Sequence, residues 1–211
     1  MYGKVLKVIH RFLAKKAGAR SFEYFSEDLI SPVQDLMLEH GILRRILLIY
    51  RHFIKNLNQG DTPNLPLLFR AVQMVHFFIE NYHEKIEEMY LFPAFKKSGL
   101  EKSLIDELEN EHEMGRSITS ELLEQLSQSD PDLNWTVSKL TKYVDFYEKH
   151  SAEEDTIIFP QFPELVSKVE YRNLAKLMES SEETILGKDG VEGLLMEISV
   201  IEKELGIGDH G

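Results

Sequence analysis

Residues 83–95 read HEKIEEMYLFPAF, and residues 150–162 read HSAEEDTIIFPQF. The second segment repeats the first in constant register, because each has a histidine, a glutamate four positions later, a second acid and then FPxF. Side chains four positions apart lie on one face of an α-helix, one turn from each other. The repeat therefore predicts two helices, each of which presents an imidazole and a carboxylate to one metal environment.

A second repeat accompanies the first. Residues 39–44 read EHGILR, and residues 111–116 read EHEMGR. A unit of two helices, EHxxxR followed by HxxxE[ED]xx[LI]FPxF, thus occurs twice in the chain. An antiparallel bundle can relate the two copies by a pseudo-two-fold axis.

The surrounding sequence predicts an all-α, up-down-up-down four-helix bundle with helical extensions. Apolar residues recur at helical spacing in four long stretches that are separated by short segments rich in Gly, Pro, Asn, Asp or Ser. The first helix is expected to start at Pro32, with Ser31 as its N-cap. The four helices are expected at about Pro32–Leu57, Leu67–Phe92, Leu100–Gln128 and from the turn at 129–131 to Phe159. Pro93 and later Gly99 are expected to close the second helix, and Pro160 the fourth.

The bundle is expected to span residues 26–163, between an N-terminal segment, 1–25, and a C-terminal appendage, 164–211. Two further helices are expected in the appendage, at about Leu165–Met178 and Gly190–Leu205. With 211 residues and 43% apolar content, the chain can bury one sizeable core, and composition gives no reason to add a second large domain.

The repeated residues predict a site for two metal ions at the bundle axis. A single helical histidine is more often a surface or packing residue, but two copies in constant register make an accident improbable. If both glutamates bridge, each metal ion receives two imidazole nitrogens and two carboxylate oxygens, and positions remain for outside ligands. Such a set suits iron best, with manganese or zinc possible. The six expected ligands are His40, His83, Glu87, His112, His150 and Glu154.

Composition excludes several classes of function. The chain has no cysteine, so disulfides, iron–sulfur clusters and thiolate metal sites are ruled out. Its formal charge of −12 disfavours nucleic acid and anionic membranes as partners. No apolar run approaches the roughly 20 residues that a transmembrane helix needs, so a soluble, cytoplasmic protein is expected.

The N-terminal segment differs from the rest of the chain. Positions 1–22 carry several basic side chains and no acid, with apolar residues at helical spacing. Such a segment can form a basic amphipathic helix, which either docks on the acidic body or lies on a membrane surface. We expect docking or fraying rather than membrane contact.

The pattern H, HxxxE, H, HxxxE, with FP after the second and fourth helices, resembles the hemerythrin-like (HHE cation-binding) domain over roughly residues 30–163. That resemblance implies an oxygen-bridged di-iron centre on the six residues named above. The oxygen-carrier branch has a further histidine where this chain has Arg116, and an aspartate ligand at the place of Asp155. The resemblance therefore favours a sensor or handler of O₂, NO, peroxide or iron over a reversible oxygen carrier.

The same residues allow two other interpretations. A ferritin-like di-iron oxidase would use ExxH motifs, which occur at Glu80–His83 and Glu109–His112, but helix four has Tyr147 where that motif needs Glu. A purely structural bundle leaves the repeat unexplained. The pattern thus favours a binding module over an enzyme, with a small diatomic molecule or peroxide as its partner.

The remaining polar residues carry weaker expectations. His76 is expected to support or pack rather than to ligate, and His10, His52 and His210 to lie at the surface. Arg44 and Arg116 are expected to pair with Glu39, Glu111 or ligand carboxylates, or to form ordinary ion pairs between helices. Arg116 would add positive charge near one end of the site. Tyr147 and Glu80 could hydrogen-bond a bound ligand, but they are expected in core packing or at a solvated edge. The FPxF segments are expected to bury their aromatic rings.

Overall fold

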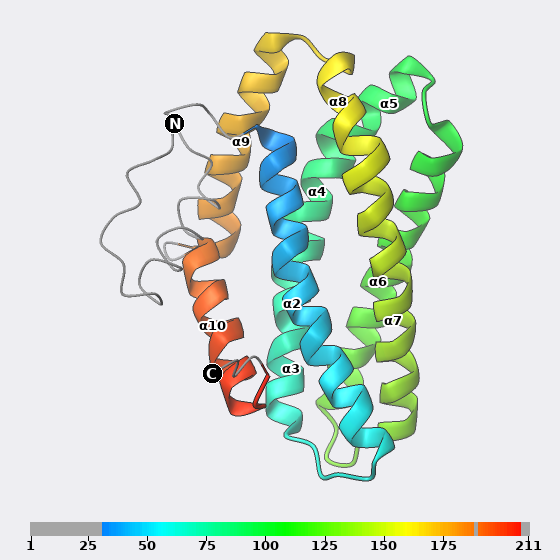
Figure 1. Ribbon diagram of the computed structural model, residues 1–211, viewed down its shortest axis with the longest axis vertical. Coiled ribbons are helices and arrows are strands. Elements are labelled where there is room, and N and C mark those ends of the chain that lie inside the picture. The colour runs from blue at the N-terminus through cyan, green and yellow to red at the C-terminus, as the bar shows by residue number, and fades with distance from the viewer. Residues whose placement is uncertain (1–30, 188–189, 208–211) are drawn as a thin grey trace.

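The computed structural model describes residues 31–187 and 190–207, and in these ranges every regular element is helical (Figure 1). The all-α expectation is confirmed for this part of the chain. The predicted N-terminal segment, 1–25, lies outside the described residues. The elements are α2 (Pro32–Asn58), α3 (Leu65–Met74), η1 (Val75–His83), α4 (Glu84–Ile86), η2 (Glu87–Leu91), α5 (Phe92–Ser98), α6 (Lys102–Leu126), α7 (Leu133–Glu153), η3 (Glu154–Ile158), α8 (Phe159–Leu165), α9 (Lys168–Leu186) and α10 (Gly190–Glu204), where η marks π-helical turns.

Four long helical segments lie side by side (Figure 1). They are α2, the composite segment 65–98, α6, and the composite segment 133–165. Helix α2 packs against α7, α3 and η1, and α6 packs against α7, α3 and η1 from the other side. Helices α9 and α10 run along α2 and the 65–98 segment (Figure 1). This packing brings all four histidine-bearing helices to one common interior.

Capping side chains fix where two of these helices begin. Ser31 accepts a hydrogen bond from the backbone of Gln34, whose side chain in turn accepts one from the backbone of Ser31. This capping box satisfies N–H groups that would otherwise lack partners, and Pro32 in the first turn has no N–H that needs one. Ser31 is thus the N-cap that the sequence predicted. Asp132 caps α7 in a similar way through the backbone N–H of Trp135.

The predicted helix ends at Pro93 and Pro160 are wrong. The helices continue through both prolines, to Ser98 and to Leu165. A proline inside an α-helix has no N–H to donate, and its ring meets the carbonyl one turn earlier. In this chain a π-helical turn, η2 or η3, ends just before each proline and widens the hydrogen-bond spacing. The wider turn accommodates the proline, so the helix does not stop.

The interior combines a large apolar core with a polar centre. The phenylalanines of the two FPxF segments are buried, as predicted. Near them lie the repeated histidines and glutamates, which are buried as well. Among the described residues, no helix is both long enough and apolar enough to cross a bilayer.

Candidate metal centre

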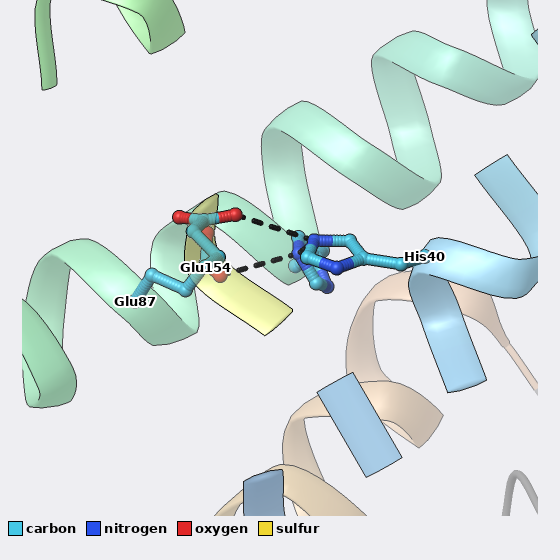
Figure 2. Close-up of side chains that lie close together, drawn as sticks. His40, Glu87 and Glu154 are labelled. Atoms are coloured by element: carbon cyan, nitrogen blue, oxygen red, sulfur yellow. Dashed lines mark hydrogen bonds and ion pairs between the residues drawn. The ribbon is translucent and has the colours of Figure 1, made fainter. Parts of the chain in front are cut away.

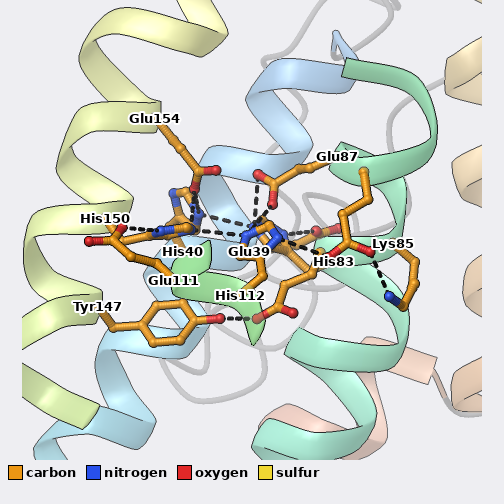
Figure 3. A network of polar contacts seen from close by, with 12 residues as sticks. Glu39, His40, His83, Lys85, Glu87, Glu111, His112, Tyr147, His150 and Glu154 are labelled. Atoms are coloured by element: carbon orange, nitrogen blue, oxygen red, sulfur yellow. Dashed lines mark hydrogen bonds and ion pairs between the residues drawn. The ribbon is translucent and has the colours of Figure 1, made fainter. Parts of the chain in front are cut away.

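The structure brings the six predicted ligands together inside the four long segments (Figure 3). His40 comes from α2, His83 from the end of η1, His112 from α6 and His150 from the end of α7. The two glutamates are the first residues of the π-helical turns η2 and η3. All six side chains are at most 1% exposed. The centre is therefore enclosed by the helices that supply it.

The six residues form two groups that share both glutamates. The first quartet consists of His40 and His83 with Glu87 and Glu154, and the second quartet consists of His112 and His150 with the same two glutamates. In each quartet the possible ligand atoms lie within 4.8 Å of one another. The imidazole Nε2 atoms face each other at 3.0 Å in the first quartet and 3.1 Å in the second. Each quartet could hold one metal ion.

The two shared glutamates lie between the quartets. Glu87 places Oε1 3.3 Å from His83 Nε2 and Oε2 3.5 Å from His112 Nε2. Glu154 places Oε2 3.3 Å from His40 Nε2 (Figure 2). The same oxygen lies 3.2 Å from His150 Nε2. Both carboxylates are fully buried, and their oxygens have no hydrogen-bond partner among the described residues. A buried carboxylate is costly unless it is paired or binds metal, so these oxygens suit bridging ligands.

Each EH pair supplies a support for the histidine of the following helix. Glu39 Oε2 lies 2.7 Å from His83 Nδ1, and Glu111 Oε2 lies 2.9 Å from His150 Nδ1. When a carboxylate accepts the Nδ1 proton, the imidazole keeps its Nε2 lone pair free for a metal ion and becomes a better donor. The glutamate before each single histidine thus orients the histidine of its partner helix.

The second acid of each E[ED] pair supports the other two histidines. Asp155 Oδ1 lies 2.8 Å from His40 Nδ1, and Glu88 Oε1 lies 3.2 Å from His112 Nδ1. All four imidazoles therefore have a carboxylate on Nδ1 and turn Nε2 toward the shared glutamates. The EH and E[ED] repeats together contain the candidate ligands and the carboxylates that contact them.

The carboxylates control protonation in the metal-free centre. Burial opposes the charged form of His150, but Glu154 and Glu111 raise its pKa to about 10. Burial likewise opposes the charged form of His83, and Glu87 and Glu39 raise its pKa well above the ordinary value. Burial would raise the pKa of Glu154, but His150 and His40 hold it well below its usual range. A metal ion that binds here must replace protons on the histidines.

The two repeated arginines stabilise the supporting carboxylates. Arg44 donates to Asp155 at 2.6 Å, and Arg116 donates to Glu88 at 2.7 Å and to Glu84 at 2.6 Å. Neither arginine pairs with Glu39, Glu111 or a ligand carboxylate, so these predicted pairs are wrong and the ion-pair alternative holds. The charge of Arg116 is balanced by two carboxylates.

The other polar residues lie outside the quartets. Tyr147 donates a hydrogen bond to Glu84, and its ring centroid lies 5.1 Å from that of His150. His76 Nδ1 lies 3.0 Å from Glu80 Oε2 and reaches no ligand group. His52 is half-buried and hydrogen-bonds Asn56, so the prediction that it lies at the surface is only partly correct. His10 and His210 lie outside the described residues.

Sequence reasoning did not assign roles to Glu88, Asp155 or Glu84. The first two were visible as the repeated second acid, and that constancy was the available signal. Glu84 had no such signal, because the equivalent position in the second copy of the repeat is Ser151. Glu84 is fully buried, and it is one of the positions at which the two copies of the repeat differ.

Comparison with known proteins agrees with this geometry. A family model described as the hemerythrin HHE cation binding domain matches residues 31–162. This range includes all six predicted ligands and the four supporting carboxylates. No solved structure matches the chain.

Similar chains also occur in mycobacteria. Proteins described as uncharacterized from Mycobacterium bovis and Mycobacterium tuberculosis are each 34% identical to this chain over 184 residues. The matched region covers 85% of this chain and 72% of each relative. The similarity therefore extends beyond the family domain into the flanking sequence.

Proposed function

The chain belongs to the hemerythrin HHE cation-binding family, and from that premise we propose that it is a non-haem di-iron protein that senses or handles O₂, NO, peroxide or iron itself. Its fold would be the up-down-up-down four-helix bundle of that family. The observation that carries the proposal is that Glu87 and Glu154 belong to both quartets. Two carboxylates shared in this way would bridge two metal ions.

The donor set favours iron. Four imidazoles and two carboxylates offer nitrogen and oxygen only, which suits iron, with manganese or zinc as competitors. Two bound iron ions would supply redox and Lewis-acid chemistry. The six side chains would hold the ions, and the supporting carboxylates would keep every Nε2 directed inward. Burial of the centre would exclude bulk water and restrict access to small molecules. The proposed setting is the cytoplasm, where a protein without cysteine needs no oxidising compartment.

The ligand set argues against the ferritin-like alternative. That site would recruit Glu80 and Glu109 from the two ExxH motifs. Glu80 instead lies 3.0 Å from His76, and Glu109 pairs at 2.6 Å with Lys96 near the surface. Neither carboxylate belongs to a quartet. The two glutamates that do belong lie one helical turn after a histidine, which is the hemerythrin-like arrangement.

Reversible oxygen carriage is a weaker alternative. At the positions where the carrier branch has its extra histidine and its aspartate ligand, this chain has Arg116 and Asp155. Asp155 contacts the Nδ1 of His40 and Arg44, and Arg116 contacts Glu84 and Glu88. These side chains already support the imidazoles. We therefore expect oxidation to a stable diferric state rather than reversible release of O₂.

Metal analysis with an optical spectrum of the aerobically purified protein tests the proposal. About two iron ions per chain and near-ultraviolet absorption of an oxygen-bridged diferric pair are expected. Glu87→Gln should lose at least one ion, because it removes a charge shared by both quartets. Glu109→Gln is the matched control, since Glu109 lies outside the centre, and it should load fully. A colourless protein that binds only zinc would refute the redox part of the proposal.

A further inference from the structure

A second buried polar cluster lies on one side of the metal centre. Its central residue is Glu80, which is 1% exposed and precedes His83 by about one turn on η1. The groups that surround Glu80 come from four segments: His76 and Glu84 from its own segment, Tyr50 from α2, Thr119 from α6, and Tyr143 and Tyr147 from α7. No arginine or lysine faces it among these groups, so Glu80 is not held by a salt bridge to either.

Several atoms of this cluster need partners that the described residues do not provide. Glu80 Oε1 and the hydroxyls of Tyr50 and Tyr143 are buried without a hydrogen-bond partner in the described part of the chain. Buried polar groups are almost always satisfied by protein or by ordered water. The Thr119 hydroxyl, which also faces Glu80, is a further buried atom without a partner in the described part of the chain. Unpartnered polar atoms gathered around one carboxylate are the kind of group that ordered water satisfies inside proteins.

The cluster connects the solvent with the metal centre. At the outer end, His76 Nδ1 lies 3.0 Å from Glu80 Oε2, and the His76 side chain is 41% exposed. At the inner end, Tyr147 stacks on Tyr143 with a centroid distance of 4.8 Å, and its hydroxyl donates a hydrogen bond to Glu84. Carboxylate oxygens of Glu84 and Glu88 lie within 4.8 Å of a ring nitrogen of His112. Groups that can exchange protons thus extend from the surface to a ligand of the second quartet.

The electrostatics of Glu80 suit a carrier of protons. Burial raises its pKa, interactions with Thr119 and His76 oppose the rise, and Glu84 adds to it. A carboxyl group with a raised pKa holds a proton more readily than an ordinary glutamate does, so it can take part in proton transfer. The buried tyrosines keep their protons, because burial raises the pKa of Tyr143 and Tyr147 well above the ordinary value. Hydroxyls that stay protonated can pass a proton on without carrying charge.

We propose that His76 and Glu80 form the outer part of a proton route, continued by ordered water and the hydroxyls of Tyr143 and Tyr147, that supplies the metal centre. The inference rests on the proposed function, because a buried centre that reduces peroxide needs protons. Reduction of hydrogen peroxide to two water molecules breaks one O–O bond, forms two O–H bonds, and takes two electrons and two protons. The two electrons would come from the reduced iron ions that the six side chains would hold. His76 receives each proton from solvent and passes it to Glu80.

The pseudo-symmetry of the chain places this route on one side only. In the second copy of the repeat, Tyr147 stands at the position of Glu80, and Ser151 stands at the position of Glu84. The repeat preserves the ligands and their supporting carboxylates but not these positions. Binding of metal ions by the repeated residues therefore does not explain why Glu80 and its neighbours occur on this side.

Stopped-flow oxidation of the reduced, iron-loaded full chain by hydrogen peroxide tests the route. Glu80→Gln keeps the shape of the side chain but cannot carry a proton, and it should slow oxidation at least about tenfold. His76→Ala should slow it to a similar extent, and added imidazole should restore the rate by replacing the missing group at the surface. His52→Ala is the control, because His52 contacts Asn56 and not the cluster. It should oxidise at the wild-type rate, with or without imidazole.

An infrared spectrum of the loaded, resting protein gives a readout that is independent of turnover. A protonated carboxyl band that titrates above the ordinary range of a glutamate should disappear in Glu80→Gln. Iron content and the optical spectrum of each variant show whether its centre is intact. Wild-type rates in both variants, a slow His76→Ala protein that imidazole does not rescue, or a band that survives in Glu80→Gln would each overturn the route. A chain that binds no iron fails earlier, at metal analysis, and that result refutes the proposed function instead.

Discussion

Replacement of Glu39 by glutamine should weaken metal binding in the first quartet without removing a ligand. Glu39 is fully buried, and its Oε2 lies 2.7 Å from His83 Nδ1. Glutamine keeps an oxygen that can accept the same proton, but it removes the negative charge that makes the imidazole a stronger donor. The ligand set, the helix and the side-chain volume stay almost unchanged.

The size of the effect follows from the kind of bond that changes. Hydrogen bonds to charged groups contribute roughly 1.5–3 kcal/mol, about twice the neutral value. Loss of the charge should therefore remove about 1.4 kcal/mol, which is a tenfold loss of affinity. Glu39→Ala removes the whole bond and should approach the upper end of the roughly 10- to 100-fold range for partners of metal-binding histidines. Glu111→Gln should act in the same way on His150, because Glu111 Oε2 lies 2.9 Å from its Nδ1.

Competition with a chelator measures the change directly. Each variant is loaded with iron and titrated with a chelator of known affinity, and stoichiometry is measured separately. Glu107→Gln is a matched control, since Glu107 lies on the same helix as Glu111 but pairs with the exposed Lys149. Affinities of Glu39→Gln and Glu39→Ala within about twofold of the wild type would show that the carboxylate does not tune the metal site.

Further predictions concern the ligands, the N-terminal segment and pH. His83→Ala or His150→Ala should lose most bound metal and lower the thermal midpoint of unfolding, because metal at about 100 times its Kd stabilises the fold by about 2.7 kcal/mol. Calorimetry and metal analysis measure the two effects. Unchanged metal content in both variants would refute the assignment of these ligands. A truncated protein that begins near Phe25 should keep its metal stoichiometry, and vesicle sedimentation of the full chain shows whether residues 1–22 contact anionic membranes. In the metal-free protein the raised pKa of His150 contributes stability that is fully present below about pH 6.5 and is lost as pH rises to about 10. Denaturant unfolding across this range should show that the free energy of unfolding of the metal-free protein declines. The metal-loaded protein should show no such decline. Stopped-flow mixing of reduced protein with O₂ should give a stable diferric product, and an adduct that deoxygenation fully removes would restore oxygen carriage.

The gathering of the six candidate ligands in one site could be predicted from the sequence, because the repeat depends on local spacing. His83 with Glu87 and His150 with Glu154 share a helix face whatever the rest of the chain does. Their convergence follows from four long helices with short connections, which leave few ways to bury the same faces. The expected Ser31 cap and the buried FPxF rings were equally local, and the structure has both.

The helix ends and the partners of the arginines could not be predicted in the same way. The prolines at 93 and 160 stop a regular α-helix, but a π-helical turn before each of them changes the hydrogen-bond spacing, and no residue type indicates such a turn. The partner of Arg44 is Asp155, far away in the chain, and this choice depends on how α2 and the end of the 133–165 segment are rotated about their axes. The spacing of residues within one helix does not determine how that helix is rotated against its neighbours.

The pseudo-symmetry has a consequence for the two metal positions. Four imidazoles, two shared glutamates and four supporting carboxylates are repeated, so both positions would offer the same ligand atoms. Only the second quartet, however, has Tyr147 beside His150 and the part-buried ion pair of Glu84 and Arg116 beside His112. Because Glu84 and Glu88 balance the charge of Arg116, this side differs from the other by hydrogen-bonding groups rather than by net positive charge. Reactivity that distinguishes the two ions would then arise from Tyr147 and Glu84, the positions at which the repeat breaks.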